Sequence, residues 1–562
     1  MKSCADVPFR RLCRDESGST AIAFSVTFGA VMLMMGAAVD YSRMDSLKAR
    51  LQAATDATIL ALARQGNLSP LELSARAGEL LASNMQGDPN VRLVAGPDHR
   101  NNAVEMCIDT TTKVSASIMQ IAQMSDITVK ATSCAAVSDA YYEIALVLDN
   151  SGSMGDWAGN DTKIGGAKSA ANTLIDKLTV GSNQSAIAAV SVVPFAASVN
   201  IGSQYRTASF MDLEGLSSIH WQNIFNPTVA GASWRPVNRF GIYDKIFNAN
   251  DFTSGTAWSG CVEERPGNYL LSDAKAVTSN PDSLYVPMFA PDEPTGAGNN
   301  YLSDTGGACA SGDAYDQADI ANGDGSGRSK MCKYNISTKL SSSYASKANY
   351  SCTTKALQPL TTDMATAKSK VGEMAANGNT NIAQGLAWGW RTISPNTPFV
   401  PSNSSPSAQQ LPAGYGSRLA DGRLVKKVVI LMTDGDNTWG SNSYSYTKKL
   451  SGGSTTWAST NTGRYGPYGY WQNARLGSAP SSDSAAVDQM DSAVRSVCDK
   501  IKAAGVTVYT VAFGTSISAD GKSLLQSCAS DPGKYYSPAT SSEIISSFQT
   551  IADSLQVLHL TR

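Results

Sequence analysis

The sequence predicts an α/β protein: a doubly wound, mostly parallel sheet with large insertions, preceded by a single transmembrane helix and a small helix-plus-strands region. Three observations carry this prediction. A long uncharged apolar stretch occurs near the N-terminus. From residue 141 onward, short apolar runs alternate with helical spacing, which is typical of a parallel sheet covered by helices on both faces. Two polar stretches, at about residues 200–360 and 435–484, interrupt this alternation and are expected to be insertions.

The N-terminal apolar stretch predicts a membrane anchor. The 23 residues from Ser17 to Val39 carry no charge, which is enough for one helical crossing of a hydrocarbon core about 30 Å thick. Four basic residues precede it: Lys2, Arg10, Arg11 and Arg14. The positive-inside rule therefore predicts that residues 1–16 form a cytoplasmic tail and that the rest of the chain is exported. The alternative is a cleaved signal peptide, with the small residues Gly36 and Ala38 before the cut, which exports the same part of the chain.

Residues 40–140 are expected to form a long helix followed by a small β region. The helical pattern continues from Asp40 and meets no breaker before Gly66. Two later stretches, residues 103–118 and 126–137, are rich in residues that favour strands. We therefore expect a few antiparallel strands that rest on the helix.

Strands and helices alternate over residues 141–557. The expected strands are 142–149, 185–195, 426–434 and 506–514. The expected helices are 163–178, 362–376, 381–393, 484–505 and 541–558. The first strand contains the apolar run "IALVL", as in strands that a parallel sheet buries on both faces.

The cysteines favour disulfides in an oxidising compartment. Cys4 and Cys13 precede the apolar stretch and should stay reduced. Eight cysteines follow it without any Cys-x-x-Cys pair, which favours disulfides over metal binding. Eight cysteines allow 105 connectivities. Pairing of neighbours gives the expected bridges Cys107–Cys134, Cys261–Cys309, Cys332–Cys352 and Cys498–Cys528.

Oxygen-bearing side chains gather where the expected strands end. Asp149 closes the first strand, and Ser151 and Ser153 follow at every second position. Asp434 closes the strand at 426–434, and Thr380 lies in a loop that opens a helix. Because ligands bind beyond the carboxyl ends of the strands in open α/β sheets, we expect these five side chains to meet. They suit Mg²⁺, or another divalent cation such as Mn²⁺ or Ca²⁺, with a coordination position left for the carboxylate of a partner.

The motif "DNSGSM" at residues 149–154, together with Thr380 and "TDGDN" at residues 433–437, resembles the metal-ion-dependent adhesion site of von Willebrand factor A (vWA) domains. The resemblance implies a Rossmann-like vWA fold over residues 141–557. It also implies that the serines and the threonine contact the metal, that the two aspartates help to hold it, and that a partner supplies the sixth ligand. The two aspartates are 285 residues apart, a departure from the family spacing that the insertions explain.

The chain is also similar to TadE/TadG-like Flp (tight-adherence) pilus-assembly proteins, through residues 38–63 and insertion motifs such as "WSGCVEERP" at residues 258–266. The resemblance implies a single-pass protein of the bacterial inner membrane, with a cytoplasmic N-terminus and a periplasmic or extracytoplasmic bulk. It implies partners among pilus or secretion-machinery proteins, or a surface ligand that offers a carboxylate, and a role in pilus assembly or adhesion. Ala23 stands where processed pilin-like relatives carry a Glu, so we expect a retained anchor.

Two other functions stay open from the residues alone. A structural envelope protein would use the metal only for stability. An exported metal-dependent hydrolase is disfavoured, because the sequence has no G-x-S-x-G or H-E-x-x-H motif and its three histidines, His99, His220 and His559, lie far apart. Glu263 and Glu264 are adjacent, so they should point in opposite directions rather than act as a catalytic pair. With 45 Lys+Arg against 47 Asp+Glu, we expect no general attraction to nucleic acid.

Overall fold

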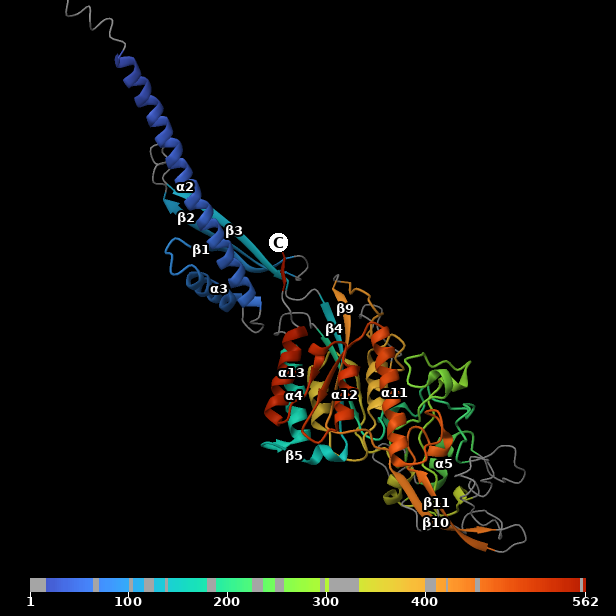
Figure 1. The fold of residues 1–562 in the computed structure, drawn as a ribbon. Helices are drawn as coiled ribbons and strands as arrows, with labels where there is room; N and C mark the ends of the chain where they lie inside the picture. The colour runs from blue at the N-terminus through green and yellow to red at the C-terminus, as the bar shows by residue number, and fades with distance from the viewer. Residues whose placement is uncertain are drawn as a thin grey trace, which may run out of the picture. The chain divides into compact units, whose positions relative to one another are not determined.

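A computed structural model describes most of the chain and shows two compact units (Figure 1). The described residues are 17–63, 70–100, 105–115, 126–136, 140–178, 188–224, 236–247, 257–293, 299–302, 333–399, 411–420, 423–449, 455–555 and 559–561. The first unit comprises Met1–Asp139, Val180–Gln184 and Gln556–Arg562, and the second comprises Ala140–Thr179 and Ser185–Leu555.

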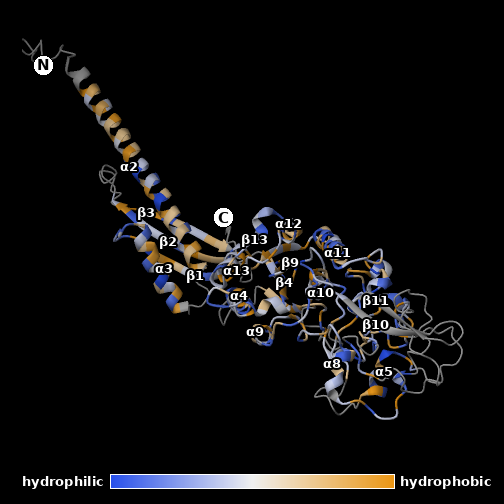
Figure 2. Cartoon of the chain, turned by 60° about the horizontal axis from the view of Figure 1, so that its bottom comes forward, coloured by the Kyte–Doolittle hydropathy of each residue, from blue (hydrophilic) through white to orange (hydrophobic). Residues whose placement is uncertain are grey.

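The first unit begins with one continuous helix, α2 (Ser17–Ala63), which includes the predicted anchor. Its N-terminal half is mostly apolar (Figure 2). Side chains there are exposed: Ile22, Phe24 and Met34 are 69%, 68% and 66% exposed. By length and composition, this helix is able to cross a membrane. Further along, Leu51 and other apolar residues of α2 are buried, because the helix packs there on a sheet.

That sheet has four antiparallel strands in the order β1–β2–β3–β14: Arg92–Arg100, Glu105–Ser115, Asp126–Ala136 and His559–Thr561. Cys107 and Cys134 lie opposite each other on β2 and β3 and form the predicted disulfide. The helix α3 (Pro70–Asn84) and the strand β1 were not predicted. The C-terminal strand β14 belongs to this unit, although the helix just before it belongs to the other.

The second unit contains the predicted doubly wound sheet. Its six strands, in chain order, are β4 (Ala140–Asp149), β7 (Ala188–Phe195), β8 (Gln358–Thr361), β9 (Leu424–Thr433), β12 (Thr507–Ala512) and β13 (Tyr535–Tyr536). They are arranged in the order β13–β12–β9–β4–β7–β8, and all pairings are parallel except that of β7 with β8. Numbered along the chain, this order is 3-2-1-4-5-6, the arrangement of doubly wound nucleotide-binding folds. The central strand β4 is buried along its whole length, which explains its unbroken apolar run.

Helices cover both faces of this sheet (Figure 1). Helix α4 (Lys163–Leu178) packs with α9 (Met364–Gly372) and α13 (Ser541–Leu555), whereas α10 (Ile382–Ile393) packs with α11 (Asp483–Ala503), which contacts α12 (Ala519–Cys528). Helix α10 approaches the sheet closely at two glycines. A Cβ atom on Gly389 would lie 2.3 Å from Val147 Cγ2, and one on Gly385 would lie 2.7 Å from the Phe195 ring.

The two insertions contain little regular structure. Between β7 and β8, the described α-helices are α5 (Arg239–Ile246) and α8 (Ala345–Ala348). The second insertion contains the antiparallel hairpin of β10 (Ser441–Lys449) and β11 (Thr455–Gly463). A smaller hairpin, β5 (Trp157–Ala158) with β6 (Asp161–Thr162), precedes α4. The insertion between β7 and β8 shares one hydrophobic core with the sheet, so it is not a separate domain.

Buried ion pairs hold that insertion in place. Glu264 pairs with Arg391 of α10 (2.5 Å between Oε1 and Nη2) and accepts a hydrogen bond from Gln384 of the same helix. Glu263 instead pairs with Arg239 and Arg475. The two adjacent carboxylates therefore contact different arginines, as predicted from their adjacency, and both are buried.

One part of the predicted disulfide framework is wrong. Cys261 is bonded to Cys352, so neither the Cys261–Cys309 nor the Cys332–Cys352 bridge forms. The physical reason is that the chain after α8 folds back along the segment before Cys261, where Asn349 accepts a hydrogen bond from Ser259 N and donates one to Ala257 O. Cys309 and Cys332 lie outside the described residues. The predicted Cys498–Cys528 bridge is confirmed and joins α11 to α12.

We expect the Cys498–Cys528 bridge to stabilise the second unit strongly. Replacing both cysteines with serine should lower its free energy of unfolding by about 3–4 kcal/mol, because the bridge closes a loop of 30 residues. Urea unfolding followed by tryptophan fluorescence measures this, since all nine tryptophans belong to the second unit. The matched control replaces Cys107 and Cys134 of the first unit and should leave the fluorescence transition unchanged. An unchanged midpoint in the Cys498/Cys528 variant would contradict the expectation.

Candidate metal centre

The first part of the candidate centre is the loop after β4. Asp149 ends the strand and is fully buried. Its Oδ1 accepts a hydrogen bond from the backbone N–H of Ser151 at 2.7 Å, and its Oδ2 accepts one from Thr433 Oγ1 at 2.6 Å. The adjacent Asn150 donates its backbone N–H to Phe195 O at 2.7 Å, which ties the loop to the end of the neighbouring strand β7. The carboxylate is therefore fixed from two sides.

The second part is the end of β9. Asp434 is fully buried, and its Oδ1 accepts a hydrogen bond from Ser153 Oγ at 2.8 Å. Ser153 Oγ lies 3.2 Å from Ser151 Oγ. Four of the five predicted residues are thus joined by hydrogen bonds, although Asp434 lies 281 positions after Ser153 in the chain.

Thr380 lies in a third loop that is bonded to both of the others. The backbone N–H of Gly152 donates to Gly378 O at 2.9 Å, which joins this loop to the Asp149 loop. Thr380 N donates to Thr438 Oγ1 at 2.8 Å, and Thr438 N donates to Thr380 O at 2.9 Å, which joins it to the chain after Asp434. Thr380 is 4% exposed and directly precedes Asn381, whose side chain caps α10. The structure therefore brings together the three loops that carry the five predicted residues.

The donor chemistry of this set fits a hard divalent cation. Two carboxylates and three hydroxyls supply only oxygen atoms, and Mg²⁺ takes oxygen ligands and keeps several waters. Within the part of the chain that the structure describes, no three His, Cys, Asp or Glu side chains cluster in a way that could hold a metal. The candidate centre consequently depends on its hydroxyls as well as on its two aspartates.

A residue that sequence reasoning missed, Lys163, contacts this centre. It is the first residue of α4, and its Nζ donates to Asp434 Oδ2 at 2.7 Å and to Ser516 Oγ at 3.2 Å. Its residue exposure is only 5%. One signal in the sequence was available: a cation at the start of a helix interacts unfavourably with the helix macrodipole.

Burial and the neighbouring Asp434 carboxylate raise the pKa of Asp149 to about 6, and the hydrogen bonds from Thr433 and Ser151 only partly offset them. The folded protein therefore binds the Asp149 proton more tightly than the unfolded chain does. Protonation of Asp149 stabilises the metal-free fold at low pH, and this stabilisation is lost as the pH rises through about 6. This proton would also compete with a cation for the same oxygen atoms.

Cation binding at this centre should therefore weaken in acid. We expect the Mg²⁺ affinity to be constant above about pH 7 and to fall about tenfold per pH unit below the pKa of Asp149, because one proton has to leave. Calorimetry in two buffers of different ionisation enthalpy measures both the affinity and the number of protons released. A constant affinity down to pH 5 with no proton release would contradict this expectation.

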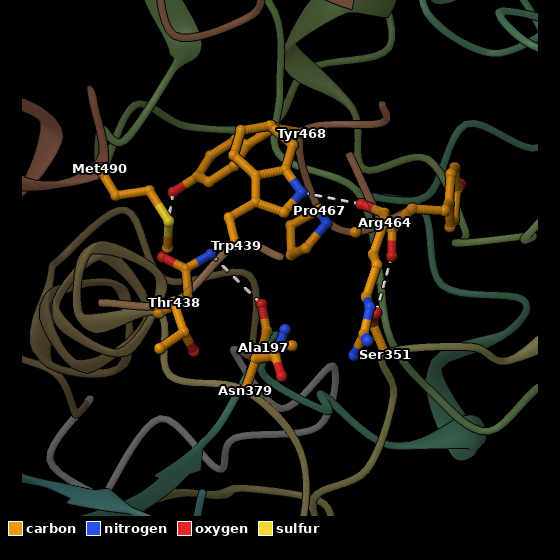
Figure 3. A pocket seen from close by; sticks show the side chains of 12 residues that line it. Ala197, Ser351, Asn379, Thr438, Trp439, Arg464, Pro467, Tyr468 and Met490 are labelled. Atoms are coloured by element: carbon orange, nitrogen blue, oxygen red, sulfur yellow. Dashed lines mark hydrogen bonds between the residues drawn. The ribbon is translucent and has the colours of Figure 1, made fainter. Parts of the chain in front are cut away.

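A polar cleft of about 510 Å³ opens beside the Thr380 loop. Its lining includes Asn377, Gly378 and Asn379 of that loop, together with Ser351 and the exposed Arg464 from the two insertions. A smaller pocket of about 20 Å³ shares part of this lining, and Figure 3 shows Trp439 Nε1 donating to the Arg464 carbonyl oxygen at its edge. The insertions therefore form a concave polar surface next to the candidate centre.

These features define the class of the protein. The 3-2-1-4-5-6 sheet, with the "DNSGSM" loop at its carboxyl edge, is a vWA-type α/β fold, as the sequence resemblance implied. Residues 18–65 match the family model described as Flp pilus-assembly TadE/G-like, which confirms the resemblance predicted for the N-terminal part. A search of curated proteins finds no similar sequence.

Solved structures with low overall similarity include a pilus tip protein and a mussel byssus protein. The vWF domain of the type V pili tip protein Mfa5 from Porphyromonas gingivalis is 10% identical, with a TM-score of 0.30, over 74% of this chain and 95% of that one. Proximal thread matrix protein 1 from the mussel byssus is 11% identical, with a TM-score of 0.27, over 75% of this chain and 48% of that one, about half its length. A further structure of that mussel protein has a zinc-occupied MIDAS motif, with 10% identity, a TM-score of 0.26 and coverage of 76% and 48%.

Proposed function

We propose that the chain is a membrane-anchored, extracytoplasmic protein of Flp/Tad-type pilus assembly or adhesion that binds a partner without catalysis. In this proposal, residues 1–16 are cytoplasmic, residues 17–39 cross the bacterial inner membrane, residues 40–140 form the TadG-like region, and residues 141–557 form the vWA domain. Partners are pilus or secretion-machinery proteins, or a surface ligand, that offer a carboxylate.

The observation that carries the proposal is the meeting of three loops at the carboxyl edge of the sheet. The hydroxyls of Ser151, Ser153 and Thr380 would contact Mg²⁺, or a related divalent cation, and Asp149 and Asp434 would help to hold it. When bound, the cation supplies an electrophilic centre for one more carboxylate oxygen. The adjoining cleft supports the proposal, because a partner segment that reaches the cation would find amide groups of Asn377 and Asn379 beside it.

Metal-dependent capture of partners tests this function. The full-length chain, affinity-tagged and solubilised from bacterial membranes that contain the pilus apparatus, should retain pilus or secretion-machinery proteins in Mg²⁺ and release them in chelator. Thr380→Ala removes one hydroxyl ligand and should abolish the capture. Thr397→Ala, beyond the opposite end of α10, is the matched control and should keep it.

The alternative is a structural envelope protein in which a metal only stabilises the fold. In that case chelator would lower the melting temperature of the wild-type chain, but the same proteins would be captured in Mg²⁺ and in chelator. Equal capture by wild type and Thr380→Ala in Mg²⁺ would likewise contradict the proposed metal-mediated contact.

A further inference from the structure

The ammonium group of Lys163 lies within the candidate centre, although the predicted set of metal-binding residues contains no lysine. Its Nζ is 2.7 Å from Asp434 Oδ2 and 3.8 Å from Asp156 Oδ2. The Asp434 side chain is fully buried, whereas that of Asp156 is 72% exposed. Water screens a charge as exposed as Asp156, so the interaction with Asp434 dominates.

The surrounding chain is built to place this lysine. Its backbone N–H donates to Asp156 O at 2.8 Å, which fixes the start of α4 against the end of the metal loop. Gly514, with φ of +92°, lies beside the lysine stem, and a Cβ atom there would be 3.3 Å from Lys163 Cε. Ser516 accepts from Nζ and also donates its hydroxyl to Asp434 O at 3.2 Å. Lysine and aspartate are thus held by the same segments.

Both oxygens of Asp434 are consequently engaged in the protein itself. Oδ1 accepts from Ser153, and Oδ2 accepts from Lys163. A buried carboxylate without a compensating charge is costly, so the lysine allows the centre to fold without a metal. It also changes the charge balance: Asp149, Asp434 and Lys163 together carry one negative charge when both aspartates are ionised, and a dication would turn this into one net positive charge.

We propose that Lys163 is a positioning residue and permanent counter-charge that weakens cation binding by the empty centre and strengthens carboxylate binding by the loaded one. This inference rests on the proposed function and names the class of ligand, an anionic carboxylate, that the loaded centre favours. Without the lysine, two aspartates would neutralise the dication, and a partner carboxylate would bring an excess negative charge. With it, the partner carboxylate makes the centre neutral.

Calorimetric titration of the full-length protein in detergent with Mn²⁺, in chloride and in acetate at equal ionic strength, tests both effects. In Lys163→Met, we expect Mn²⁺ to bind at least about tenfold more tightly in chloride, since a cation a few ångströms away has been removed. Acetate should tighten Mn²⁺ binding to the wild type, and this effect should be several-fold smaller in the variant, because the two ligands are thermodynamically linked.

A control variant and a second neutral variant complete the test. Lys168→Met removes a lysine of the same helix whose Nζ donates to Gly372 O, and it should behave as the wild type. Lys163→Gln keeps a donor for Asp434 without the charge and should behave as Lys163→Met, so it replaces that variant if tryptophan fluorescence shows that the methionine variant does not fold. If the folded Lys163→Met or Lys163→Gln variant bound Mn²⁺ no more tightly than the wild type, this inference would be overturned, but the proposed metal centre would not. Absence of Mn²⁺ binding by the wild type would overturn the proposed function itself.

Discussion

Replacing Glu264 with alanine should lower the free energy of unfolding of the second unit by about 3–5 kcal/mol, because the change leaves Arg391 buried without its carboxylate. Arg391 is 1% exposed, and both of its terminal nitrogens donate to Glu264. Gln384 loses its acceptor at the same time. Arg391 and Gln384 belong to α10, the helix that follows Thr380, and Glu264 belongs to the insertion. The variant therefore removes hydrogen bonds and an ion pair between the insertion and α10.

Urea unfolding followed by tryptophan fluorescence measures this loss. Glu373→Ala is the matched control: its carboxylate pairs with Lys370 on the surface of the same unit, where ion pairs contribute about 0–1 kcal/mol. We expect the control to change the midpoint little. A Glu264 variant as stable as the control would show that the insertion is not held by this pair.

Replacing Asp434 with asparagine should reduce the affinity for Mg²⁺ by about 100-fold or more, since even groups that only support metal ligands typically contribute 10–100-fold. The change removes one of two negative charges and leaves Lys163 facing a neutral amide. Because the salt bridge between Lys163 and Asp434 is lost as well, the variant should also melt at a lower temperature in chelator. Calorimetry and thermal unfolding measure the two effects separately.

Asp436→Asn is the matched control for this prediction. Asp436 lies two residues further along the same loop, but its carboxylate accepts from Ser518 N at 3.3 Å instead of facing Ser153. We expect the control to bind Mg²⁺ as the wild type does. Equal affinities in the two asparagine variants would mean that Asp434 does not hold the cation.

The parts of the fold that were predictable are those that local pattern and general topology determine. The apolar run of β4 indicated a central strand, and the rule that ligands bind beyond strand ends was enough to expect Asp149 and Asp434 together. In the structure, the loop of Ser151 and Ser153 and the loop of Thr380 meet at Asp434 and the chain just after it. The two aspartates are 285 residues apart in the sequence, and this spacing alone could not show that the loops meet.

What could not be predicted depends on contacts between distant segments. Cys261 pairs with Cys352 because the chain after α8 returns alongside it, and spacing in the sequence carries no information on that return. The insertion joins the main core because Glu264 reaches α10 from 127 positions away. The sequence predicted a helix that begins at Lys163 but not the partner of this lysine, since Asp434 lies 271 positions later.

Anomalous diffraction from a crystal of the protein soaked in Mn²⁺ tests the central proposal most directly. We expect one strong peak beyond the carboxyl ends of β4 and β9, about 2.0–2.3 Å from the hydroxyls of Ser151, Ser153 and Thr380, with a water or an acetate oxygen completing the coordination. A crystal with no peak among these residues, or with a peak that the Thr380 hydroxyl does not contact, would contradict it.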